Sequence, residues 1–275
     1  MTKIRSLSQR YAVLFSLAVC VIFFLCMRCS GWIYRQLPQT IMRDLFFEFF
    51  DMLWPVALAL LLGYGFAFRA KGFVDTLIPG MPSLCLRSFL VVFAVFTAFT
   101  EETQWQTMPV MLMGVVSMIG IGIREEVIFR GIIGNSLVLK YGTSTKGLWI
   151  AIILSAALFS GIHLQNLLHG LEPIGMIAQL IGAFGMGLVF MTVYVRGGNI
   201  WVPILIHAIT DASGLFESTF TITTASGIDE MGKLSVGGAF ILLPIHIALC
   251  MFLLRKSKQP AIFARLEQLR EENKI

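Results

Sequence analysis

Long apolar stretches recur along almost the whole length of this 275-residue chain. A stretch of about 17–25 apolar residues is long enough to cross the hydrocarbon core of a bilayer as a helix. We count eight such stretches, of which the third is short: 11–27, 49–68, 87–100, 110–139, 148–165, 174–195, 200–218 and 236–254. Only 13% of the residues are charged, whereas soluble domains carry about 25%. The sequence therefore predicts an all-α polytopic membrane bundle with about eight transmembrane helices and no soluble domain of useful size.

The stretches divide the chain into three regions. Residues 1–105 hold the first three predicted transmembrane helices, and residues 106–220 hold helices four to seven. Residues 221–275 hold the last transmembrane helix and a charged cytoplasmic tail. The first stretch follows a basic segment but has no small-x-small cleavage site, so we expect a retained anchor and not a signal peptide.

Loop charges predict the orientation, because cytoplasmic loops of membrane proteins are enriched in Lys and Arg. With both termini in the cytoplasm, the inner loops carry Arg69, Lys71, Lys140, Lys146 and Arg196, and the outer loops carry Glu101, Glu102, Glu172, Asp229 and Glu230. The first outer loop departs from the pattern with Arg28, Arg35 and Arg43, and we expect its 41–50 segment to lie along the interface. The sequence predicts a multi-pass protein of the inner (plasma) membrane. The net charge of +5 is concentrated at the chain ends and is typical of topology signals, so no nucleic-acid partner is expected.

Three short patterns place ionisable side chains within the apolar stretches. They are Glu125-Glu126-Val-Ile-Phe-Arg130, Phe159-Ser-Gly-Ile-His163 and His207-Ala-Ile-Thr-Asp211. Burying one charge in a bilayer costs about 2.5–3.5 kcal/mol on insertion scales, so such residues usually mark functional sites. Carboxylates and imidazoles are also the groups that activate water and stabilise an anion.

Helix geometry predicts how the first pattern is arranged. Residues four apart share a helix face, so Glu126 is the natural partner of Arg130. Glu125 lies about 100° further round the helix and is free to face a cavity as a general base. The alternative is a solvated helix end, which Arg124 favours. The apolar sequence continues through 137–139, and this favours a position inside the membrane.

The histidine patterns have a structural alternative as well. A single histidine such as His163 often only hydrogen-bonds within a helix bundle, and an acid four residues away, such as Asp211 beside His207, often only satisfies the imidazole. The combination of both histidines with two buried acids favours catalysis.

Taken together, the three motifs resemble those of the CPBP family of intramembrane proteases, which includes the eukaryotic CAAX prenyl endopeptidase and bacterial Abi-type proteins. The resemblance covers residues 122–214. It implies that Glu125 deprotonates water with help from His163, and that Glu126 and Arg130 form a supporting pair. It places His207 and Asp211 on the oxyanion side or in contact with the water. Where this family has Asn, its amide can donate a hydrogen bond, but Asp211 can do so only when protonated and is expected to orient His207.

The resemblance leaves the metal open, because it carries both a metalloprotease and a metal-free glutamate protease. Two histidines and a glutamate could hold zinc with a water in the fourth place. These residues come from three helices, however, and the chain has no His-Glu-x-x-His run. The spacing of the five cysteines matches no zinc pattern either. We expect a metal-free site.

These observations predict an intramembrane endopeptidase whose partners are the lipid bilayer and a membrane-associated peptide or lipid-anchored protein tail. Water activated by Glu125 and His163 would hydrolyse the peptide bond. Two other functions stay open. Buried Glu, Arg and His also occur in ion-coupled transporters, although no inverted repeat is evident. A non-catalytic bacteriocin-immunity or scaffold protein could keep the same residues as a structural network.

Overall fold

The computed structural model describes residues 3–99, 103–222 and 228–272. Over these ranges the chain is helical and forms no β-strand, which confirms the predicted fold class, while Trp105 and Thr221 make an isolated antiparallel bridge. The α-helices are α1 (Lys3–Arg10), α2 (Ala12–Gln36), α3 (Ile41–Leu61), α4 (Phe73–Ala98), α5 (Met108–Glu126), α6 (Asn135–Tyr141), α7 (Thr145–Ile162), α8 (Pro173–Gly197), α9 (Trp201–Gly214), α10 (Phe216–Phe220), α11 (Ile228–Leu253) and α12 (Gln259–Glu272). Short 3-10 helices η1 (Gly65–Phe68), η3 (His163–His169) and η5 (Lys256–Lys258) and the π-helix η2 (Val127–Gly134) complete the set.

Four helical segments of the described chain are long and apolar enough to cross a membrane: α2, α4, α7 continued by η3, and α8. A fifth is added if α11 and α12, which meet at a bend of 50°, form one span. The structure therefore does not confirm the predicted number of eight, although each predicted stretch overlaps a helix. Helix α3 carries four charged residues, and α9 has only 14 residues, fewer than the roughly 20 that a span requires.

Two predicted boundaries are wrong. The second stretch was expected over residues 49–68, but α3 begins at Ile41 and ends at Leu61. The third stretch was expected to begin at residue 87, but α4 begins at Phe73 and includes Pro79 and Pro82. The charged Arg87 does not mark a helix end, because its side chain is buried inside the bundle beside Met186 and His246.

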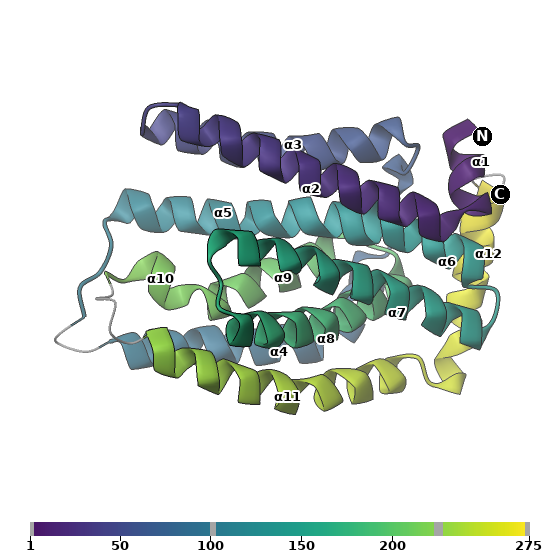
Figure 1. Ribbon diagram of the computed structural model, residues 1–275. Coiled ribbons are helices and arrows are strands. Elements are labelled where there is room, and N and C mark those ends of the chain that lie inside the picture. Colours follow the sequence, from purple (N-terminus) through teal and green to yellow (C-terminus); the bar gives the residue numbers. More distant parts are fainter. Residues whose placement is uncertain (1–2, 100–102, 223–227, 273–275) are drawn as a thin grey trace.

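Helices α5, η2 and α6 follow one another as a rod that runs the length of the molecule (Figure 1). The hairpin of α2 and α3 lies along one side of this rod. Helices α7, α8 and α9 lie on its other side, and α4 and α11 lie beyond them. Both chain ends lie at the same end of the bundle. The motif-bearing helices therefore occupy the centre of the molecule, with α9 packed between α4 and α5 and α8 between α7 and α11.

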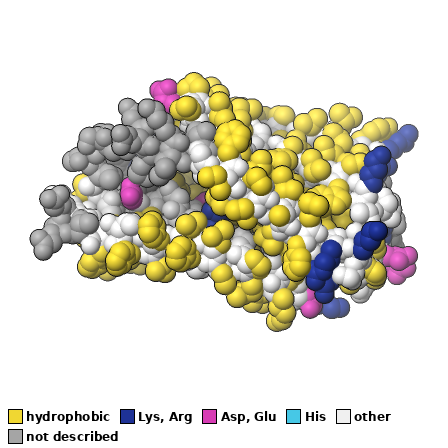
Figure 2. All heavy atoms as spheres, turned by 90° about the horizontal axis from the view of Figure 1, so that it is seen from below, with side chains coloured by type: hydrophobic (Ala, Val, Ile, Leu, Met, Phe, Trp, Pro, Cys, Tyr) yellow, Lys and Arg dark blue, Asp and Glu magenta, His cyan; other side chains and the backbone are white. Residues whose placement is uncertain are grey.

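The outer surface is apolar, as expected for helices in lipid. Figure 2 shows one face on which hydrophobic side chains cover the middle, while Lys and Arg side chains gather toward the end that carries the termini. Large apolar side chains such as Leu14 on α2 and Phe96 on α4 are 65% and 79% exposed. Exposed apolar surface on this scale marks contact with lipid or with another protein.

Two glycines allow the motif-bearing helices to approach closely. A Cβ atom at Gly122 on α5 would lie 3.0 Å from the carbonyl oxygen of Ile204 on α9. A Cβ atom at Gly187 on α8 would lie 2.9 Å from Cα of Ala156 on α7. Small residues permit such backbone contacts in membrane bundles. They bring α5 against α9 and α7 against α8 at the level of the ionisable residues.

Candidate active site

The three motifs meet in the interior of the bundle. The paired glutamates end α5, and Arg130 follows in the π-helix η2. His163 comes directly after α7, while His207 and Asp211 lie one turn apart on α9. π-Helical turns are rare and often occur at functional sites. Here the π-helix begins with the residue after Glu126.

Glu126 links two other members of the cluster by hydrogen bonds. Its Oε1 accepts one hydrogen bond from Nη1 of Arg130 at 2.9 Å and another from Nδ1 of His207 at 2.7 Å. The side chains of Glu126 and Arg130 are fully buried, and that of His207 is 6% exposed. The pairing of Glu126 with Arg130 agrees with their four-residue spacing. The bond to His207 joins residues 81 positions apart and was not predicted.

Aromatic rings and a carbonyl complete the surroundings of Arg130. Its guanidinium lies 4.3 Å from the ring centre of Phe159 and 5.1 Å from that of Phe190, and its Nη2 donates to the carbonyl oxygen of Gly187 at 3.4 Å. Phe190 also stacks on His207 at 5.2 Å. Such contacts stabilise a buried cation. The sequence analysis missed Phe190, because a phenylalanine within an apolar helix carries no distinguishing pattern.

Glu125 and Asp211 face the second nitrogen of His207. Oε2 of Glu125 lies 3.8 Å from Nε2 of His207, and Oδ2 of Asp211 lies 3.7 Å from the same atom. Both oxygens are buried and have no hydrogen-bond partner within the described parts of the chain. Leaving a buried carboxylate oxygen without a partner costs free energy. Oε2 of Glu126 is also buried without a partner in the described chain, but the oxygens of Glu125 and Asp211 are the two that lie near Nε2 of His207.

His163 borders this group but does not bond to Glu125. Its Nδ1 lies 2.8 Å from the carbonyl oxygen of Phe159, so that nitrogen carries the proton, and Nε2 has no hydrogen bond to the described parts of the chain. The ring is half-buried and packs edge-on against Phe159. It interacts electrostatically with the carboxylates of Glu125 and Asp211. The structure thus brings all six predicted site residues into one region, with His163 at its edge.

The arrangement does not fit a zinc site. No three His, Cys, Asp or Glu residues are placed to hold a metal ion in residues 3–99, 103–222 and 228–272. The Nδ1 hydrogen bonds of His207 to Glu126 and of His163 to a carbonyl leave each Nε2 available as a ligand. These Nε2 atoms and Glu125 are not grouped closely enough to hold a metal ion.

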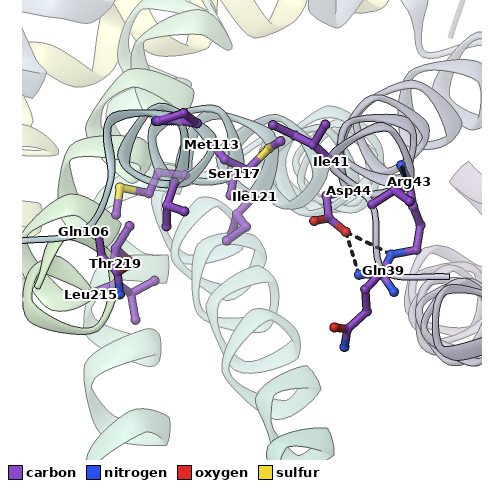
Figure 3. Close-up of a pocket in the computed structure, with 15 residues that line it drawn as sticks. Gln39, Ile41, Arg43, Asp44, Gln106, Met113, Ser117, Ile121, Leu215 and Thr219 are labelled. Atoms are coloured by element: carbon purple, nitrogen blue, oxygen red, sulfur yellow. Dashed lines mark hydrogen bonds and ion pairs between the residues drawn. The ribbon is translucent and has the colours of Figure 1, made fainter. Parts of the chain in front are cut away.

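A cavity of about 600 Å³ lies about one helical turn from the cluster. It is bounded by the beginning of α3, the N-terminal part of α5 and the α9–α10 junction (Figure 3). Its lining includes Ile121, one helical turn before Glu125, and Leu215, one turn after Asp211. Arg43 and Asp44 form an ion pair at its α3 side. The cavity lies toward the end of the bundle opposite the termini, and Glu125, His207 and Asp211 are not among its lining residues.

Fold and site define a helical membrane protein whose interior holds an acid–arginine–histidine cluster. Residues 106–213 match the family model of the Type II CAAX prenyl endopeptidase Rce1-like proteins. The match confirms the resemblance to the CPBP and CAAX proteases, and all six candidate residues lie within it. No curated protein and no solved structure matches the chain.

Proposed function

We propose that this protein is an intramembrane endopeptidase that hydrolyses a membrane-associated peptide or a lipid-anchored protein tail. The match to the CAAX prenyl endopeptidase family supports protease activity, and the apolar helices support a substrate held at the bilayer. One observation carries the proposal. Nε2 of His207 lies 3.8 and 3.7 Å from buried oxygens of Glu125 and Asp211, which are beyond direct hydrogen-bond distance and have no other partner in the described chain, so a water beside these atoms would have three polar partners.

Glu125 is the general base in this proposal. Its carboxylate takes a proton from the water as the water oxygen attacks the carbonyl carbon of the substrate. The tetrahedral intermediate carries the negative charge on the former carbonyl oxygen. When the carbon–nitrogen bond breaks, the leaving nitrogen takes the proton from Glu125. His163, with its free Nε2 at the edge of the group, helps to hold the water.

His207 stabilises the oxyanion. Its Nδ1–H is fixed by Glu126, so its Nε2 faces the reaction centre in a set orientation. A protonated ring donates a hydrogen bond from Nε2 to the developing negative charge. Asp211 lies against the same nitrogen and stabilises the charged ring. Phe190, stacked on His207, keeps the ring in place.

The cavity beside α5 provides the route for the substrate. An extended peptide in this space would pass Ile121 and Leu215 before it reaches Glu125 and Asp211. The lining mixes apolar side chains with polar ones, the latter being Gln39, Thr40, Arg43, Asp44, Gln106, Ser117 and Thr219. This supports a peptide segment with both apolar and polar side chains as the part that lies in the cavity.

The orientation is also part of the proposal. The end of the bundle with the termini gathers Lys and Arg (Figure 2), and such an end faces the cytoplasm in membrane proteins. We therefore place both termini on the cytoplasmic side of the plasma membrane.

The proposal is tested with purified protein in lipid nanodiscs and a pool of peptides with and without lipid anchors. Reactions run in ¹⁸O-labelled water should yield fragments whose new carboxylates carry the heavy isotope. The Glu125→Ala variant should yield none. An intact pool with folded wild-type protein would contradict the proposal for those substrate classes.

A further inference from the structure

Arg124 precedes the paired glutamates and lies between two carboxylates from different helices. Its Nη1 donates to Oδ2 of Asp51 on α3 at 2.9 Å, and its Nη2 lies 4.0 Å from Oε1 of Glu125. The side chains of Arg124, Asp51 and Glu125 are only 13%, 16% and 12% exposed. Exposed ion pairs contribute little, but losing one partner of a shielded pair leaves an uncompensated charge.

Asp51 is held in turn by its neighbours. Ser30 on α2 donates a hydrogen bond to Oδ1 of Asp51 at 3.2 Å. Helix α3 also packs directly on α5, because a Cβ atom at Gly120 would lie only 2.8 Å from Cε of Met52. The backbone that presents Asp51 to Arg124 is therefore fixed against the helix that carries Glu125.

The two carboxylate oxygens of Glu125 lie near different residues. Oε1 faces Arg124 at 4.0 Å, and Oε2 faces Nε2 of His207 at 3.8 Å. The last torsion of a glutamate side chain has broad minima, so groups on either side restrict the plane of the carboxylate. The other charged or titratable groups that act on Glu125 are Arg130, His163 and Asp211.

We propose that Arg124, anchored by Asp51, is a positioning residue that orients Glu125 toward His207. The inference rests on the proposed function of Glu125 as the base. It adds Asp51 on α3 and Ser30 on α2 to the residues that support the active site. Both lie outside residues 106–213, the segment that matches the family model. The N-terminal helices then have a role in the chemistry and do more than complete the bundle.

A purely structural role for the Asp51–Arg124 pair would hold α3 against α5 and nothing more. Glu48 provides the matched control, because it also lies on α3 and accepts a hydrogen bond from Ser117 on α5. Glu48 is an acid and offers Glu125 no counter-charge, although its own charge also acts on Arg124. A Glu48→Ala variant therefore weakens the α3–α5 contact without removing a partner of the base.

The kinetic test compares Arg124→Gln, Arg124→Lys and Glu48→Ala with wild type. Misplacing a reacting group by about 1 Å can cost up to about a hundredfold in rate. We expect Arg124→Gln to lower kcat by at least about tenfold with KM unchanged, and Arg124→Lys to recover most of the loss. Equal losses in Arg124→Gln and Glu48→Ala, or a loss confined to KM, would overturn the inference.

A second measurement needs no substrate, so it separates this inference from the proposed function. Dicyclohexylcarbodiimide modifies buried carboxyl groups in their protonated form, and mass spectrometry reports the modification at Glu125. Removing the nearby cation should favour the protonated form, so Arg124→Gln should be modified faster at Glu125 than wild type and Glu48→Ala. Equal rates in all three proteins contradict the positioning role, whatever the outcome of the cleavage assay.

Discussion

His207 donates its Nδ1–H to Oε1 of Glu126 across 2.7 Å, and this bond connects α9 to the end of α5. The same oxygen also accepts from Arg130. One carboxylate thus neutralises a buried arginine and fixes the ring whose Nε2 lies near Glu125 and Asp211. The Oε2 atoms of both glutamates are buried without a partner in the described chain, so what distinguishes Glu126 is that its Oε1 already accepts from Arg130 and His207.

Breaking the Glu126–Arg130 pair should destabilise the protein. Arg130→Ala leaves the Glu126 carboxylate buried without its guanidinium partner, and Glu126→Gln leaves Arg130 without a counter-charge. Breaking a buried pair typically costs about 3–5 kcal/mol. Thermal unfolding in detergent should show a lower Tm for both variants. If Glu125→Gln proves as damaging as Arg130→Ala, the division between base and structural pair is wrong.

Removing His163 should affect the rate more than the fold. The ring lies at the edge of the cluster and is half-buried, so a His163→Ala variant should unfold near the wild-type temperature. Loss of a group that assists proton transfer typically costs about 10²–10⁴ in rate. Steady-state cleavage should show that loss in kcat. An unchanged kcat would assign His163 a packing role against Phe159.

Chelation should leave activity unchanged, because the described residues do not form a metal-ligand set. Protein purified without added metal should contain far less than one equivalent of zinc. Both quantities are measured on one preparation, by elemental analysis and by cleavage after dialysis against a chelator. Cleavage that is lost on chelation and restored by zinc but not magnesium would make His163 and His207 metal ligands.

Both termini should lie on the cytoplasmic side. A reporter that is active only in the cytoplasm should work when it is fused after Ile275, because the basic end of the bundle is expected to stay inside. A reporter fused at the same position that works only outside the cell would reverse the orientation. In that case the cavity beside α5 would open toward the cytoplasm.

The sequence predicted contacts within a helix better than contacts between helices. The four-residue spacing of Glu126 and Arg130 is a property of one helix and was recognisable from the sequence alone. The bonds from Glu126 to His207 and from Arg124 to Asp51 depend on how α5, α9 and α3 rotate and pack against one another. That packing is decided by close approaches such as the one at Gly122, and no local pattern reports it.

Charged residues account for the errors in the helix prediction. Arg87 was treated as the start of a helix, although the bundle buries it within α4. Arg124 was weighed as a sign of solvated charges, yet it is paired with Asp51 and shielded from solvent. A hydropathy profile includes the free-energy cost of burying a charged side chain. It does not include the ion-pair partner on another helix that offsets this cost. Several predicted spans therefore include helices too polar or too short to cross a bilayer alone.

The central claim is that the carboxylate of Glu125 activates the attacking water, and a single comparison of cleavage rates tests it most directly. Glu125→Gln keeps the shape of the side chain but cannot accept the proton, and Glu172→Gln makes the same change at an exposed position before α8. We expect Glu125→Gln to fold like wild type and to lose cleavage by at least about a hundredfold, while Glu172→Gln cleaves at the wild-type rate. A folded Glu125→Gln variant that cleaves as fast as wild type would contradict the account.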